Sequence, residues 1–209
     1  MSKLMAPAPS RPLPLALFAS GNGSNAEAII KAWQEGRLTQ AEPVLMIANR
    51  ACPAIEKAKA QGLETLVILP GDFASREAHE EAILDELRDR QIELIALAGY
   101  MRLLTPTLIE PYQGRIVNIH PALLPEFPGT HAIERAYQLG VPFSGVTCHL
   151  VDEGMDSGPI LDQVKVDRLP DMSLDAFEAA IHQAEHKLYP RCLERLATEL
   201  RSQAPVTNN

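Results

Sequence analysis

The sequence predicts an α/β fold: one domain built on a Rossmann-like open sheet, mostly parallel with an antiparallel edge, with helices on both faces. Short, continuous apolar runs alternate with segments of helical periodicity along the chain. This alternation is typical of strands buried on both faces and joined by right-handed crossovers. No repeat or linker divides the 209 residues, and this length suits one substantial domain.

Each expected strand is a short run of aliphatic residues. The strands are expected, in chain order, at residues 15–19, 44–48, 65–68, 94–98, 115–119, 144–151 and 159–166. Apolar and polar residues alternate in the last of these, which indicates an edge strand.

The segments between the strands carry apolar residues at helical spacing. The first helix has Ala26, Ile29, Ile30 and Trp33 along one side and should stop near Gly36. The other helices are expected at 53–61, from a Ser75 cap to about 90, at 106–112, at 131–139, and from Ser173 to about 200. Pro190 should kink the last helix, because proline cannot donate a backbone hydrogen bond.

The ends and the composition limit the class of protein. We expect a disordered, proline-rich leader over residues 1–13, the folded domain over 14–200 and a frayed tail over 201–209. A net charge of -8 argues against nucleic-acid and anionic-membrane partners. No apolar run reaches the roughly 18 residues of a membrane span. Three widely spaced cysteines fit a reducing cytoplasm. We also expect the protein to be a monomer or a weak homodimer.

Polar and glycine-rich segments follow three of the expected strands. Residues 21–25, 99–104 and 118–124 come directly after the first, fourth and fifth strands. In open α/β sheets a ligand lies beyond the carboxyl ends of the strands. We therefore expect these three segments to line one cleft.

The segment G-N-G-S-N at 21–25 joins a strand to a helix. Its glycines allow close approach of a phosphate, and the helix N-terminus offers free N–H groups. Together with Ala26 it also satisfies a loose dinucleotide fingerprint, but Asn49 and Arg50 stand where that fingerprint needs an acid. A phosphomonoester therefore fits this segment better than NAD does. Arg50 leaves NADP open as an alternative ligand, and a tight turn that binds no ligand is a further alternative.

Asn118 and His120 lie two residues apart on an expected strand, so their side chains should share a face. An amide can stabilise an oxyanion, and a histidine can transfer a proton near neutral pH. Asp156, in a glycine-bearing acidic loop, could raise the basicity of the imidazole. The alternative for Asn118 and His120 is a strand end at which Asn118 caps a turn and His120 is incidental. The alternative for the acidic loop is an ordinary solvated turn.

His182, Glu185 and His186 spell H-x-x-E-H on an expected helix, the order of an inverted zinc-peptidase motif. A peptidase needs a further ligand downstream, and a polar helix face bordering the cleft is the preferred interpretation. Arg76 and Arg102 are candidate carboxylate binders or surface charges. We expect His79, His131 and His149 to be structural.

Four motifs together resemble one family: G-N-G-S-N, Gly99-x-Met101-Arg102, N-I-H-P-A-L-L-P and the segment at 156–160. The chain is similar, over roughly residues 14–200, to the small glycinamide ribonucleotide formyltransferases that use 10-formyltetrahydrofolate. The resemblance implies that Asn118, His120 and Asp156 are catalytic. It places the ribonucleotide at Gly23, Ser24, Asn25, His182 and Glu185. It places the folate at Arg76, Met101, Arg102, Leu103, Leu104, Asn118, Asp152, Glu153, Gly154, Met155 and Asp156.

The resemblance also implies the reaction, in which the formyl group of the folate co-substrate passes to the glycyl amine of glycinamide ribonucleotide in purine synthesis. No metal is required. Ala122 and His182 depart from residues common in the family, Ser and Gln. The alternatives are a formyl-folate hydrolase, another formyl-folate-dependent transferase such as one acting on methionyl-tRNA, and a non-catalytic nucleotide-binding module.

Overall fold

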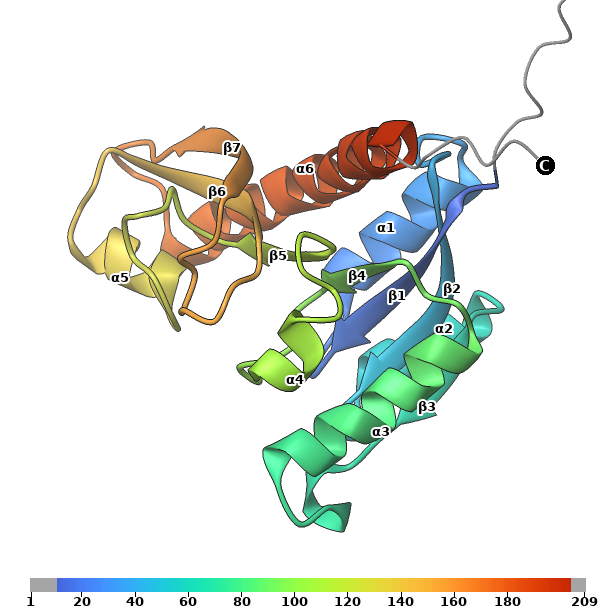
Figure 1. The fold of residues 1–209 in the computed structure, drawn as a ribbon. Helices are drawn as coiled ribbons and strands as arrows, with labels where there is room; N and C mark the ends of the chain where they lie inside the picture. Colours follow the sequence, from blue (N-terminus) through green and yellow to red (C-terminus); the bar gives the residue numbers. More distant parts are fainter. Residues whose placement is uncertain (1–10, 204–209) are drawn as a thin grey trace, which may run out of the picture.

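The computed structural model describes residues 11–203 (Figure 1). Most of the expected leader and tail lies outside these residues. Within them, Leu13 already belongs to the first strand, where its backbone N–H donates to the Gln40 carbonyl at 2.9 Å. Residues 201–203 belong to the last helix. The folded part therefore begins slightly earlier and ends slightly later than expected.

The described residues form one seven-stranded sheet, in the order β3-β2-β1-β4-β5-β6-β7. The strands are β1 (Leu13–Ala19), β2 (Ala41–Ala48), β3 (Glu64–Val67), β4 (Leu94–Leu97), β5 (Ile116–His120), β6 (Phe143–Leu150) and β7 (Ile160–Asp167). Neighbouring strands from β3 to β5 are parallel, whereas β6 and β7 are antiparallel additions. The predicted mostly parallel sheet with an antiparallel edge is confirmed.

Some strand boundaries differ from the prediction because pairing extends them. β2 begins at Ala41 because this residue pairs with Leu13 of β1, although Glu42 and Pro43 interrupt its apolar pattern. β5 extends to His120 because His120 pairs with Thr147 of β6. All seven residues of β1 are buried, as expected for a central strand.

Helices cover both faces of the sheet (Figure 1). They are α1 (Ser24–Gln34), α2 (Pro53–Ala60), α3 (Arg76–Asp89), α4 (Pro106–Ile109), α5 (Ala132–Gln138) and α6 (Leu174–Gln203), with a short 3-10 turn, η1 (Pro70–Asp72). α1, α2, α5 and α6 share one hydrophobic core, and α3 and α4 share the core on the opposite face. Ser75 and Ser173 accept hydrogen bonds from Ala78 and Ala176, which confirms both as helix starts.

Helix α6 continues through Pro190 as one 30-residue element, although a kink is expected there. Pro190 and its neighbour Tyr189 are both buried. The Tyr189 hydroxyl lies 2.8 Å from the Val117 carbonyl oxygen and 3.2 Å from that of Leu97. Burial of this hydroxyl raises the pKa of Tyr189 well above its usual range. The helix is thereby held to β4 and β5, and this packing offsets the backbone bond that proline cannot make.

None of the helices in residues 11–203 is long and apolar enough to cross a membrane.

We expect Tyr189→Phe to lower the free energy of unfolding by about 1–2 kcal/mol, because two buried carbonyls lose a hydrogen-bond donor. Tyr112→Phe is the matched control, since the buried Tyr112 hydroxyl reaches a single carbonyl, that of Ile92. Urea unfolding followed by circular dichroism measures both. A Tyr189 variant as stable as the wild type would contradict the role given to this contact.

Candidate active site

Ser20, the residue after β1, joins the ends of three parallel strands. Its backbone N–H donates to the Gly99 carbonyl beyond β4 at 3.0 Å. Its hydroxyl donates to Asn49 Oδ1 beyond β2 at 2.6 Å and accepts from the Met101 N–H at 2.9 Å. The segments at 21–25 and 99–104 therefore start from one hydrogen-bonded point at the carboxyl edge of the sheet.

Asn118 and His120 lie on β5, where the antiparallel strand β6 pairs with it. Asn118 is directly opposite His149, and its Nδ2 lies 3.2 Å from His149 Nε2. His149 Nδ1–H donates to the Leu150 carbonyl at 2.8 Å. Nε2 of the neutral ring is therefore an acceptor for the Asn118 amide, and becomes a donor when the ring is protonated.

Asp156 reaches both histidines. Its Oδ2 lies 3.4 Å from His120 Nδ1 and accepts from the Gly129 N–H at 2.7 Å. Its Oδ1 lies 3.7 Å from His149 Nε2. The structure thus brings the three predicted residues together: Asp156 contacts His120 directly and is linked to Asn118 through His149.

The backbone of Asp156 has φ +52°, in the left-handed region that non-glycine residues rarely adopt. Such a conformation persists when surrounding contacts determine it, and the contacts to Gly129 and the histidines do so here. A Cβ at Gly158 would collide with the Leu150 carbonyl oxygen. The loop can therefore fold inward only with glycine at this position.

The carboxyl group of Asp156 is held in its ionised form. The hydrogen bond from His149 is the largest cause, and the Gly129 N–H and the positive charge available on His120 act in the same direction. Together they outweigh burial and lower the pKa of Asp156 to about 2. At neutral pH the site therefore has a fixed negative charge beside two imidazoles. His120 Nε2–H donates to the Phe127 carbonyl at 2.8 Å, so Nδ1 is the ring nitrogen that faces Asp156.

His149 is the residue that sequence reasoning missed, because it was expected to be structural. It is 2% exposed and contacts both Asn118 and Asp156. Its part in the site depends on the register of β6 against β5, since a one-residue shift would turn it to the other face of the sheet. The position opposite Asn118 in the antiparallel pair is the only signal that could have identified it. His79 and His131 do have local partners, the Ile68 carbonyl and Glu134.

Gly23 caps α1 at the predicted phosphate loop with φ 77°. A Cβ there would lie 2.5 Å from Ala54 Cβ, so glycine is required both for the backbone angle and for the contact with α2. Ser24 and Asn25 form the first turn, whose N–H groups have no intrahelical acceptor. Asn25 Oδ1 is buried and has no hydrogen-bond partner in residues 11–203, so a ligand could satisfy it.

The H-x-x-E-H segment on α6 contains a hydrogen-bonded pair. His182 Nδ1 lies 2.7 Å from Glu185 Oε2, and this bond raises the pKa of His182 against the effect of burial. Burial lowers the pKa of His186, while Glu27 of α1 acts in the opposite direction. The α6 segment therefore lies close to the first turn of α1. In the part of the chain that the structure describes, no group of three or more His, Cys, Asp or Glu side chains is placed to hold a metal ion.

The residues expected on the folate side belong to three segments. Arg76, at the start of α3, donates through Nη2 to the Leu103 carbonyl at 2.5 Å, which connects two of the segments. Leu104 packs against the core beneath them. In the third segment, Asp152 Oδ1 accepts from the Gly154 N–H and the Ser157 hydroxyl and shapes the loop around Glu153.

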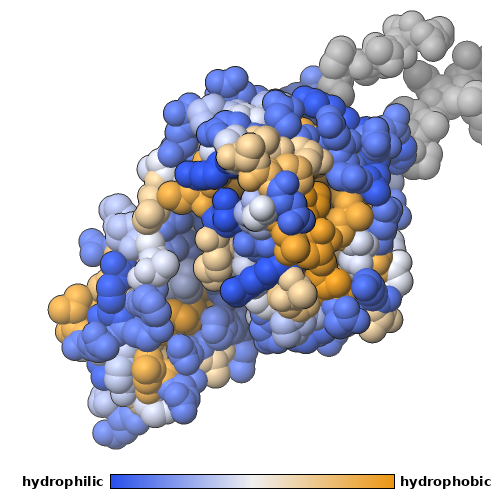
Figure 2. Space-filling view, turned by 90° about the horizontal axis from the view of Figure 1, so that it is seen from below, coloured by the Kyte–Doolittle hydropathy of each residue, from blue (hydrophilic) through white to orange (hydrophobic). Residues whose placement is uncertain are grey.

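Three large apolar side chains in these segments remain exposed: Met101 at 73%, Leu103 at 56% and Met155 at 56%. Figure 2 shows the face toward which β1 runs, where hydrophobic side chains gather among hydrophilic ones. Exposed apolar groups beside a polar centre are typical of a binding surface for a ligand with an apolar part.

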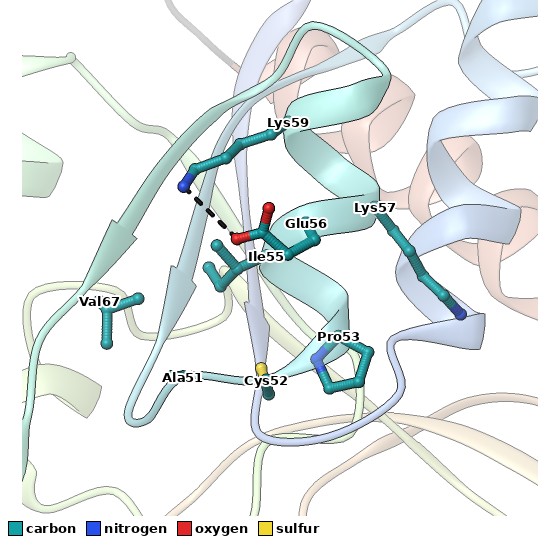
Figure 3. A pocket seen from close by; sticks show the side chains of 8 residues that line it. All are labelled: Ala51, Cys52, Pro53, Ile55, Glu56, Lys57, Lys59 and Val67. Carbon is teal, nitrogen blue, oxygen red and sulfur yellow. Dashed lines mark ion pairs between the residues drawn. The ribbon is translucent and has the colours of Figure 1, made fainter.

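A separate hollow of about 570 Å³ lies beside α2, beyond the ends of β2 and β3 (Figure 3). Its lining is mostly apolar and consists of Ala51, Cys52, Pro53, Ile55, Glu56, Lys57, Lys59 and Val67. None of the predicted site residues lines it.

The sequence matches the family profile described as formyl transferase over residues 13–193. It is 43% identical to the phosphoribosylglycinamide formyltransferase of Bacillus subtilis (strain 168), over 87% of this chain and 93% of that protein. The Escherichia coli (strain K12) enzyme of the same name is 33% identical, over 84% of this chain and 83% of that protein. The solved structure of glycinamide ribonucleotide transformylase 1 from Geobacillus kaustophilus has a TM-score of 0.85 at 49% identity, covering 88% of this chain and 98% of that chain.

The depressed pKa of Asp156 predicts a loss of stability in acid. Its folded value of about 2 lies below the ordinary 3.8, so its contribution is complete above about pH 5 and is lost as the pH falls through 4 toward 2. We expect the wild type to lose about 1 kcal/mol more than Asp156→Asn between pH 6 and pH 3, because roughly half of the contribution remains at pH 3. Urea unfolding at pH 6 and pH 3 measures this, with the exposed Asp85→Asn as control. Parallel losses in wild type and Asp156→Asn would rule out the assigned pKa.

His149→Gln should raise the pKa of Asp156 from about 2 toward 3.8, because the largest of the groups that lower it is lost. Carboxyl ¹³C chemical shifts followed from pH 6 to pH 2 report the titration directly. His131→Gln, a change on the exposed surface, should leave the titration as in wild type. An unchanged Asp156 titration in His149→Gln would show that His149 is incidental to the site.

Proposed function

The chain belongs to the formyl transferase family, and from that premise we propose that it is a phosphoribosylglycinamide formyltransferase. It transfers the formyl group of 10-formyltetrahydrofolate to the glycyl amine of glycinamide ribonucleotide. The products are N-formylglycinamide ribonucleotide, for purine synthesis, and tetrahydrofolate. Support comes from relatives with this activity in their names that align along nearly their whole length.

One observation carries the proposal: the ionised Asp156 lies beside His120 and His149, with Asn118 on the same strand as His120. Formyl transfer needs a donor for a developing oxyanion and groups that move protons between two amines. An amide, two imidazoles and a carboxylate supply these functions. A module that only binds nucleotides has no use for this group.

In the proposed mechanism, the neutral glycyl amine attacks the formyl carbon attached to N10 of the folate. The tetrahedral intermediate carries negative charge on the formyl oxygen. The Asn118 amide has two N–H donors, and one remains for this oxygen while the other faces His149. Protonated His120 adds a charge-assisted interaction.

Asp156 stabilises the positive charge on His120 and orients a water molecule, which relays the proton released by the attacking amine toward N10. His120 or that water then delivers a proton to N10 as the carbon–nitrogen bond breaks. This mechanism requires no metal and no nicotinamide.

The substrates are assigned to opposite ends of the site. The N-terminus of α1 with Gly23, Ser24 and Asn25 takes the phosphate, and His182 with Glu185 takes the ribose side. The exposed Met101, Leu103 and Met155 receive the flat folate ring system, with Arg76 and Arg102 near its carboxylates. The cytoplasmic location, the monomeric or weakly dimeric state, and the lack of nucleic-acid and membrane partners stay predictions.

One assay separates the transferase from its nearest alternative. The purified protein is mixed with 10-formyltetrahydrofolate, and folate absorbance is followed with and without glycinamide ribonucleotide. We expect a change only when the ribonucleotide is present. A change without the ribonucleotide would indicate a hydrolase, and no change under either condition would reject both activities.

Asn118→Ala and Asp156→Asn should each lower kcat about 100-fold or more, because one loses an oxyanion donor and the other the ionised carboxylate. Stopped-flow folate absorbance measures kcat, and thermal melting checks that each variant is folded. His131→Ala, which changes an exposed histidine on the α5 side, should keep the wild-type kcat. Near wild-type turnover in both site variants would show that these residues are not catalytic.

A further inference from the structure

Lys57 on α2 places a positive charge at the tip of the phosphate loop. Its Nζ lies 2.9 Å from Asn22 Oδ1 and 2.7 Å from Glu27 Oε2. We propose that Lys57 recognises the phosphate of the ribonucleotide and selects phosphorylated over unphosphorylated substrate. This inference rests on the proposed function and adds a residue that neither the loop motif nor the first turn of α1 includes.

The position of Lys57 is set by the way α2 packs on the loop. The Ala54 N–H donates to the Gly21 carbonyl at 3.2 Å, and Gly23 lies so close to Ala54 that no side chain fits between them. Lys57 follows Ala54 by three residues, so both lie on the same side of α2. Figure 3 shows the side chains of Lys57 and Lys59 extending to opposite sides of α2, although both residues line part of the hollow.

The lysine ammonium has three N–H donors, and two are directed at Asn22 and Glu27. Its side chain is 33% exposed, so the third donor can reach a ligand at the loop. The four-carbon stem is flexible, so the ammonium can also turn from Glu27 toward an arriving phosphate. Lys57 is therefore both held in place and able to respond to a ligand.

The charges around the loop explain why a full cation is needed there. The N-terminus of α1 offers only about half an elementary charge. Glu27 in the first turn of α1 opposes it, on a chain with a net charge of -8. A phosphate dianion would meet weak attraction from the backbone alone. Lys57 neutralises Glu27 and adds a strong, charge-assisted donor.

Two other cations near the loop are placed differently. Lys59 pairs with Glu56 on the hollow side of α2 (Figure 3), and both side chains are exposed. Arg50 donates through Nε to the Ser20 carbonyl at 2.5 Å, at the start of the loop and not at its tip. Lys59 is thus a matched control on the same helix. The competing explanation is that Lys57 only pins α2 to α1 through Glu27.

The test compares wild type, Lys57→Met, Lys57→Arg and Lys59→Met on glycinamide ribonucleotide and on the corresponding riboside, which lacks the phosphate. We expect Lys57→Met to raise KM for the ribonucleotide about tenfold with little change in kcat, the effect of one charge-assisted hydrogen bond at a partly exposed site. Its kcat/KM for the riboside should equal that of the wild type. Lys57→Arg should keep most of the affinity, and Lys59→Met should match the wild type.

Each result decides between the explanations. A wild type that does not formylate the ribonucleotide rejects the proposed function itself, before any variant is considered. An active wild type with an unchanged KM in Lys57→Met overturns the role of Lys57. An equal loss on ribonucleotide and riboside, or an equal effect of Lys59→Met, also overturns it. If thermal melting shows that Lys57→Met is unfolded, Lys57→Gln replaces it, because glutamine keeps a donor for Asn22 and Glu27 and removes the charge.

Discussion

The site depends on keeping one largely buried carboxylate ionised. A buried charge is costly unless it is paired and hydrogen-bonded, and Asp156 obtains both from three different segments. His120 comes from β5, His149 from β6 and the Gly129 N–H from the loop between them. These contacts stabilise the left-handed backbone of Asp156. The ionised state of Asp156, the conformation of its loop and the pairing of β5 with β6 therefore depend on one another.

The change from parallel to antiparallel pairing makes this arrangement possible. β5 is the last parallel strand, and β6 returns beside it in the opposite direction. The pairing places His149 directly opposite Asn118, at the carboxyl edge where the loops after β1 and β4 also start. The Tyr189 hydroxyl of α6 hydrogen-bonds to the backbone carbonyls of Leu97 on β4 and Val117 on β5. The strand that carries Asn118 and His120 is thus positioned both by its pairing with β6 and by its hydrogen bond to α6.

The two ends of the site carry opposite charge. Around Asp156, a fixed anion faces imidazoles that can become positive. At the N-terminus of α1, the free N–H groups carry partial positive charge, and Lys57 offsets the negative charge of Glu27 in the same turn. The exposed apolar side chains of Met101, Leu103 and Met155 lie on the loops of the folate side. This separation suits a reaction that transfers a small group from a large, flat co-substrate to an anionic substrate.

The sequence by itself determined the α/β class, the succession of strands and helices along the chain, and the loops expected at the carboxyl edge of the sheet. Continuous apolar runs and glycine turns are local signals, so they can be recognised without the tertiary structure. Asn118, His120 and Asp156 were predictable from spacing and family resemblance. Only the tertiary structure decided that His149 contacts Asn118 and Asp156, that Lys57 contacts Asn22 and Glu27, and that α6 continues through Pro190. These depend on the register of β6, on how α2 packs against the loop, and on burial against the sheet. Contacts between residues distant in sequence set all three, and no local pattern encodes them.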